Sequence, residues 1–254
     1  DKVDLHTLLL YEDKQISVDE ADMTWHALPD KQLDVTAGKQ YVPFGAFKKG
    51  MISNPLTKKL GETQSDKVLL VSNQRGDVRT QGYTFAGTGS QDTGYGMSVE
   101  YKTDAARVGV DYVSNLVESK HVVAKFASNA VANAIPAVAV HGLAKLGRVT
   151  VIAEHITATQ NVQPGDLNNK IKVAAKPATT QLEVDLDLHN DRTLALAWSG
   201  SSDAAQLKLV EEKLGVTYSQ PLYKDLQGAM ELMQSKDYDG TTDKTLTAQL
   251  AYAF

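Results

Sequence analysis

Hydrophobic and polar residues alternate along most of this chain with a period of two residues. From Leu182 to Leu188, leucine and valine occupy the even positions, and three carboxylates occupy the odd positions. Successive side chains of a β-strand point to opposite faces of a sheet, so this segment has one apolar and one acidic face. The same alternation runs through Thr245–Phe254 at the C-terminal end. The pattern predicts a protein built largely from amphipathic strands.

About fourteen segments show this alternation. Most have about eight to twelve residues, which is longer than the usual strand and close to the ~9–11 residues of a tilted strand that crosses a bilayer. We place them at Val3–Tyr11, Ile16–Ala27, Leu33–Phe44, Lys67–Gln74, Arg79–Gly87, Tyr95–Thr103, Arg107–Asn115, Ala134–Leu146, Val149–Thr159, Thr179–His189, Arg192–Ser199, Lys213–Gln220, Leu226–Met233 and Thr245–Phe254.

Short and long connections alternate between these segments, except that the first hairpin, around Asp13-Lys14-Gln15, is short where a long loop is due. Arg75–Asp77 and Gly147–Arg148 are short, whereas Gly45–Asp66 and Gln160–Ala178 are long. Outer-membrane barrels place short turns at the periplasmic end and longer loops outside. The pattern therefore predicts an all-β fold: a single antiparallel transmembrane β-barrel of about fourteen strands over residues 1–254. The long loop 44–66 is the candidate pore constriction, with a cover over the barrel rim as the alternative.

The C-terminal strand ends in Phe254, with Tyr252 two residues before it. This ending resembles the closing strand of bacterial outer-membrane proteins, which the outer-membrane assembly machinery reads. The alternative is an edge strand of a soluble sandwich, which would be an aggregation hazard in water. We therefore expect the bacterial outer membrane as the location, with the bilayer and that machinery as partners.

In a membrane barrel the aliphatic face of each strand meets lipid and the polar face lines the lumen. This arrangement predicts a water-filled, acidic lumen that favours cations, unless lumen lysines and arginines balance the carboxylates. The candidate lumen-lining residues are Glu20, Asp22, Asp34, Gln40, Glu100, Lys102, Arg107, Asp111, Glu154, Glu183, Asp185, Asp187 and Glu231.

The composition and the absence of certain motifs limit the kinds of binding and catalysis that the sequence predicts. The net charge is −5 and there is no cysteine, which argues against nucleic-acid binding and excludes thiolate chemistry. The chain has no Gly-x-Ser-x-Gly or phosphate-loop motif, and its six histidines lack metal-ligand spacing. We expect no enzymatic activity, no cofactor and no metal site.

Two observations weigh against a membrane barrel. Aromatic residues make up only 7% of the chain, although such barrels usually carry aromatic girdles. His155 and Lys39 also fall on faces that the alternation assigns to lipid. A β-bulge, a position near the membrane interface, or an altered parent sequence would each account for these two residues.

Three segments carry a family resemblance: Gly38–Phe47, Met51–Thr57 and Leu60–Thr63. They resemble the LbtU-type siderophore porins, which are outer-membrane barrels of Gram-negative bacteria. The resemblance extends through nearly the whole chain and implies passage of a ferric siderophore or another small solute. Members of that family usually begin with further N-terminal strands, so a parent with one more N-terminal hairpin would have about sixteen strands. At Lys58 and Lys59 this sequence is basic where the family is acidic.

The sequence therefore predicts an outer-membrane channel for small solutes, and the resemblance implies ferric siderophores among these solutes. A general or carbohydrate porin is the first alternative. A soluble or engineered β-barrel with a ligand-binding lumen is the second, and it should stay monomeric without detergent.

Overall fold

The computed structural model describes residues 2–12, 14–28, 30, 32–88, 92–126, 133–167 and 171–252. One sheet holds fourteen strands, as the alternation predicts. They are β1 (Val3–Glu12), β2 (Gln15–Leu28), β3 (Leu33–Tyr41), β4 (Gln64–Arg75), β5 (Val78–Ala86), β6 (Thr93–Lys102), β7 (Ala106–Val113), β8 (Ala137–Leu146), β9 (Val149–Ala158), β10 (Ala178–Leu188), β11 (Arg192–Ser202), β12 (Glu212–Tyr223), β13 (Leu226–Lys236) and β14 (Thr242–Tyr252). Phe254 lies outside the described residues.

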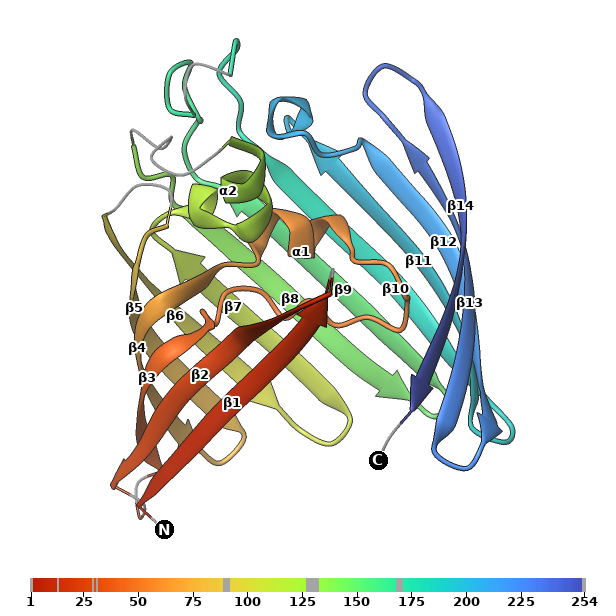
Figure 1. The fold of residues 1–254 in the computed structure, drawn as a ribbon, viewed down its shortest axis with the longest axis horizontal. Helices are drawn as coiled ribbons and strands as arrows, with labels where there is room; N and C mark the ends of the chain where they lie inside the picture. Colours follow the sequence, from red (N-terminus) through yellow and green to blue (C-terminus); the bar gives the residue numbers. More distant parts are fainter. Residues whose placement is uncertain are drawn as a thin grey trace.

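Every strand pairs antiparallel with the next one along the chain, so the sheet order is the sequence order. Figure 1 shows the sheet curving into a barrel-shaped wall, with β1 and β14 at its two edges. Among the described residues, β1 pairs only with β2 and β14 only with β13. A fully closed ring would require a further ladder along these two edges, because a bilayer offers no partners to backbone groups.

The two faces of the wall differ as predicted. On β10, Glu183 is 2% exposed, whereas its neighbours Leu182 and Val184 are 51% and 43% exposed. A cross-strand row of outward side chains joins Val184 to Leu196 of β11 and Val216 of β12. The outer face is thus aliphatic, as burial against lipid tails requires.

The connections separate by length. Figure 1 shows the short turns that follow β4, β6, β8, β10 and β12 at one end of the wall, with the end of β14 beside them. The helices α1 (Leu56–Gly61) and α2 (Lys120–Phe126) lie towards the other end. Gly76 and Gly147 in two of the short turns have φ of +56° and +63°, the left-handed region that tight hairpins use. None of the helices within the described residues is long and apolar enough to cross a membrane.

Lys39 and His155 have different explanations. The ladder between β3 and β4 shifts register between Gly38 and Gln40, so a bulge accommodates Lys39, and its Nζ lies 3.3 Å from Asp66 Oδ1. The bulge predicted as one explanation for His155 is wrong, because the ladder between β9 and β10 is regular at this residue. His155 is exposed, and its Nδ1 lies 2.8 Å from Thr180 Oγ1 on the neighbouring strand.

The interior is less polar than the alternation predicts. Buried apolar side chains from β4, β5 and β7–β9 form one cluster with residues of both helices and of the connections between strands. Phe44, Leu60 and Phe126 belong to it and are at most 2% exposed. Short apolar turns that pack inside the wall have no period-two signature, which is why the strand pattern does not reveal them.

Candidate functional site

A long connection between β3 and β4 lies inside the curved wall. We call residues 42–63 the inner loop. Its base is closed by a hydrogen bond from Val42 N to Thr63 O of 3.0 Å. Figure 1 shows the loop and α1 crossing the interior towards β9 and β10. The loop predicted at 44–66 is shorter at its C-terminal side, because β4 already begins at Gln64.

Carboxylates on the inner face of β7 and β9 hold the first half of the inner loop. Asp111 Oδ2 accepts a hydrogen bond from Gly45 N at 2.8 Å, and Glu154 Oε1 accepts one from Ala46 N at 2.6 Å. Both carboxylates are buried. Backbone N–H groups without sheet partners would be costly in a water-poor interior, so these acceptors satisfy the N–H groups of the loop. The second oxygens, Asp111 Oδ1 and Glu154 Oε2, are buried without a hydrogen-bond partner among the described residues.

Two further carboxylates hold the second half. Glu183 of β10 accepts a hydrogen bond from Gly50 N, and Glu231 of β13 accepts bonds from Ser53 N and from Ser53 Oγ. Glu231 also accepts a hydrogen bond from Thr217 Oγ1 at 3.0 Å. We call Asp111, Glu154, Glu183 and Glu231 the anchor carboxylates. Hydrogen bonds to ionised acceptors contribute about 1.5–3 kcal/mol each, so the four together fix the loop firmly to the wall.

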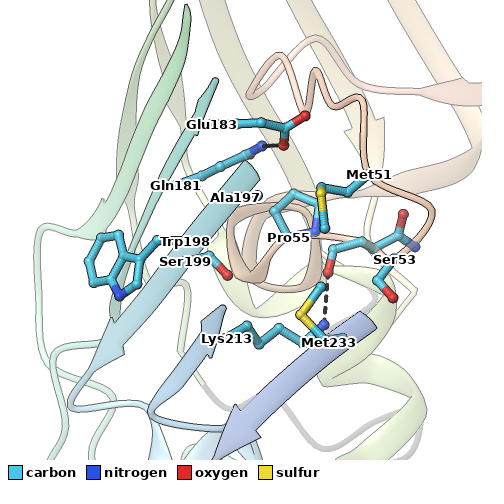
Figure 2. Close-up of a pocket in the computed structure, with 11 residues that line it drawn as sticks. Met51, Ser53, Pro55, Gln181, Glu183, Ala197, Trp198, Ser199, Lys213 and Met233 are labelled. Atoms are coloured by element: carbon cyan, nitrogen blue, oxygen red, sulfur yellow. Dashed lines mark hydrogen bonds between the residues drawn. The ribbon is translucent and has the colours of Figure 1, made fainter. Parts of the chain in front are cut away.

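Neutral side chains complete the attachment. Gln181 Nε2 donates to Lys48 O at 3.0 Å, and Gln181 Oε1 accepts from Thr57 Oγ1 at 3.2 Å. Figure 2 shows Gln181 and Glu183 side by side on β10 facing Met51 and Pro55 of the loop. The cavity in this view has a volume of about 20 Å³, which is room for about one water molecule. The contact between the inner loop and the wall is therefore tight at this place.

His141 of β8 is a buried residue of this region that sequence reasoning did not select. Its Nε2 lies 3.2 Å from Asp111 Oδ2, and its cross-strand partners are Gly109 and Glu154. The three polar groups thus form a buried row beneath the loop. The sequence signal that could identify His141 is a polar residue at a strand position whose side chain points to the same inner face as Asp111 and Glu154.

The inner face of β1–β3 is the open part of the wall. The His26 ring lies between two carboxylates: its Nδ1 is 2.7 Å from Asp34 Oδ1, and its Nε2 is 2.9 Å from Asp4 Oδ2. His6 Nδ1 lies 3.1 Å from Asp22 Oδ2 and 3.5 Å from Glu20 Oε2. Potential ligand atoms of His6, Glu20 and Asp22 lie within 4.8 Å of one another, so this group is where the described residues could hold a metal ion.

The remaining predicted lumen residues lie at three places: near the turn between β6 and β7, on β10, and on β3. Glu100 and Arg107 form an ion pair near the short turn between β6 and β7, where Lys102 is exposed. Asp185 and Gln40 are half-buried, and Asp187 is exposed on the same face of β10 as Glu183. Of the predicted set, the anchor carboxylates contact the loop, and Glu20, Asp22 and Asp34 lie on the open wall.

Gly45 is required by the geometry of the inner loop. Its φ is +81°, and a Cβ there would lie 2.4 Å from Phe47 Cζ. We expect Gly45→Ala to destabilise the attached loop by about 1–3 kcal/mol, which should speed amide hydrogen exchange in residues 44–53 about tenfold or more. Gly76→Ala is the matched control, because Gly76 also has a positive φ but no atom within 4 Å of its Cβ position. Equal exchange in both variants would contradict the assignment.

Comparison with curated proteins finds distant relatives. A UPF0422 protein of Coxiella burnetii (strain RSA 493 / Nine Mile phase I) is 24% identical over 219 residues, covering 79% of this chain and 47% of that protein. A UPF0422 protein of Legionella pneumophila (strain Lens) is 22% identical over 238 residues, covering 83% and 44%. The chain thus spans a little less than half the length of these relatives. Neither is described as an LbtU-type siderophore porin, and no protein-family model matches the chain.

Comparison with solved structures finds outer-membrane barrels. The outer membrane channel DcaP of Acinetobacter baumannii aligns with a TM-score of 0.73 and 11% identity, covering 99% of this chain and 80% of that one. The anion-selective porin from Comamonas acidovorans aligns with a TM-score of 0.67 and 10% identity, covering 94% and 79%. The predicted location in the bacterial outer membrane agrees with these matches. The chain has the fold of the bacterial outer-membrane porins and channels.

Proposed function

We propose that the protein is a channel for small hydrophilic solutes across the bacterial outer membrane, narrowed by the inner loop. One observation carries this proposal: the loop lies inside the wall and is held there by the four anchor carboxylates. A loop that only covered the rim would not contact inner-face residues of β7, β9, β10 and β13.

The physical basis is a difference in dielectric environment. A bilayer excludes polar solutes because dehydration in hydrocarbon is costly. A lumen lined by ionised and polar groups replaces part of the lost hydration. With the anchor carboxylates occupied by loop N–H groups, the carboxylates available to a solute are chiefly those of the open wall on β1–β3.

The fold also supports the proposed partners. The aliphatic outer face needs lipid or detergent, and the C-terminal strand is the segment through which the outer-membrane assembly machinery would engage the chain. Phe254, the residue on which that second expectation rests, lies outside the described residues.

Measurements of ion conductance across a lipid bilayer test the channel proposal. The full chain, folded in detergent and added to a planar lipid bilayer, should give discrete current steps, and a heat-unfolded sample should give none. If the folded protein stays silent across salt concentrations and voltages, the channel proposal fails.

A ferric siderophore is the narrower proposal for the solute, and it rests on the resemblance of the inner-loop segments to siderophore porins. Addition of a ferric siderophore should block the current at a lower concentration than a neutral disaccharide does. Equal block by the two solutes would favour a general or carbohydrate porin.

A further inference from the structure

Lysines gather around α1 at the long-loop end of the lumen. Lys49, Lys58 and Lys59 belong to the inner loop, Lys125 belongs to α2, and Lys213 begins the inner face of β12. We call these five residues the lysine cluster. Sequence reasoning noted that Lys58 and Lys59 depart from an acidic family pattern, but it did not connect them with the other three.

Hydrogen bonds bring part of the lysine cluster together. Lys49 Nζ donates to Asn54 Oδ1 at 2.7 Å and to Ile52 O at 2.6 Å, and Lys213 Nζ donates to Asn54 O at 3.0 Å. Figure 2 shows Lys213 reaching from β12 towards the loop beside Ser53. Two ammonium groups from distant parts of the chain therefore meet at one residue, immediately before α1.

Lys58 and Lys59 are neighbours on α1, but only the charge of Lys58 has an ion-pair partner among the described residues. Lys58 Nζ forms an ion pair with Glu62 Oε1 at 2.9 Å. Lys59 is half-buried, and no carboxylate among the described residues forms an ion pair with it. Burial, followed by the positive charge of Lys125, lowers the pKa of Lys59, and burial, followed by the charge of Lys58, lowers the pKa of Lys49.

A half-buried ammonium beside like charges is unfavourable unless a negative group compensates it. The carboxylates nearest to the cluster are already engaged, because Glu62 pairs with Lys58, and Glu183 and Glu231 accept the loop N–H groups. Glu183 and Glu231 offset part of the charge on Lys49, and Glu231 part of that on Lys213. Five ammonium groups still face only these three carboxylates, and neither Lys59 nor Lys125 forms an ion pair among the described residues.

We propose that the lysine cluster binds a small polyanion carrying phosphate or carboxylate groups. Ammonium groups are point-like phosphate and carboxylate binders, and several of them converging on one place favour a multivalent ligand. The long loops of such barrels face the outside, so the site would take its ligand from the medium. The role of this site in binding a solute on its way through a channel rests on the proposed function, whereas the binding of a polyanion itself does not.

Binding is measured on the full chain folded in detergent, with inorganic pyrophosphate as the probe in titration calorimetry. We expect saturable binding that weakens about tenfold in Lys59→Gln, which removes one charge-assisted contact. Lys125→Gln, an exposed position on α2, should weaken binding in the same direction and serves if Lys59→Gln fails to fold. Lys102→Gln, an exposed lysine near the short-turn end of β6, is the matched control and should bind as wild type does.

The outcomes separate the two proposals. No pyrophosphate binding by the wild type, or equal binding by wild type and the variants at Lys59 and Lys125, overturns the anion site. Binding with the expected variant pattern in a protein that gives no current steps supports the site and overturns the channel. Where channels form, the reversal potential in a salt gradient should shift towards cations in Lys59→Gln.

Discussion

The triple variant Asp111→Asn, Glu154→Gln, Glu231→Gln should show larger and noisier current steps than wild type. A hydrogen bond to an ionised acceptor is roughly twice as strong as one to a neutral acceptor, so each change costs the attached loop about 1 kcal/mol. About 3 kcal/mol in total raises the population of the displaced loop about a hundredfold. Single-channel recording over a range of voltages measures both the step size and the noise.

The control for this experiment removes the same charge from the opposite part of the lumen. The triple variant Glu20→Gln, Asp22→Asn, Asp34→Asn changes three carboxylates of the open wall on β2 and β3, which are hydrogen-bonded or ion-paired to histidines rather than to the inner loop. It should alter ion selectivity while leaving the current noise near wild type. If both triple variants behave alike, lumen charge rather than loop attachment controls the current.

Leu246→Arg should destabilise the barrel in lipid far more than Thr245→Arg does. Both residues lie on β14 and are exposed, but they point to opposite faces of the sheet. Leu246 pairs with the exposed Leu232, whereas Thr245 pairs with Met233, which is buried in a cluster with Met51 of the inner loop. An arginine on the lipid face costs up to about 2–4 kcal/mol near the middle of the bilayer, and a lumen position tolerates it.

Urea unfolding of the two variants in lipid vesicles measures this difference, and detergent-free buffer provides a second comparison. A loss of stability at Leu246 that is at least twice that at Thr245 is expected. Similar losses in both variants would mean that the aliphatic face does not contact lipid, and would favour the alternative of a soluble β-barrel.

The sequence predicts the fourteen strands correctly because their signal is local, although the strand placed at Leu33–Phe44 ends at Tyr41 and continues as the inner loop. Leu182, Glu183 and Val184 alternate in character, and the structure gives them alternating exposure. The paired turn positions Asn190 and Asp191, with φ of 62° and 54°, are residue types that tolerate the left-handed region. Periodicity of two and turn residues thus fixed the strand order without any long-range information.

The interior could not be predicted in the same way, since it depends on contacts between distant residues. Glu231 and Ser53 are 178 positions apart, and nothing in either local sequence indicates their hydrogen bonds. The helix α1 is only six residues long, too short for a helical period to stand out. Consequently the acidic inner face was predicted, but its division into anchor carboxylates and an open wall was not.

A cysteine scan along β2 tests the central arrangement most directly, because the chain contains no cysteine of its own. Single cysteines at positions 22 to 26 are introduced, and the protein in lipid vesicles is treated with a membrane-impermeant maleimide. Positions 22, 24 and 26 should react, and Met23→Cys and Trp25→Cys should be protected by lipid. Rapid reaction at positions 23 and 25, or no reaction at positions 22, 24 and 26, would contradict a water-filled lumen within a lipid-facing wall.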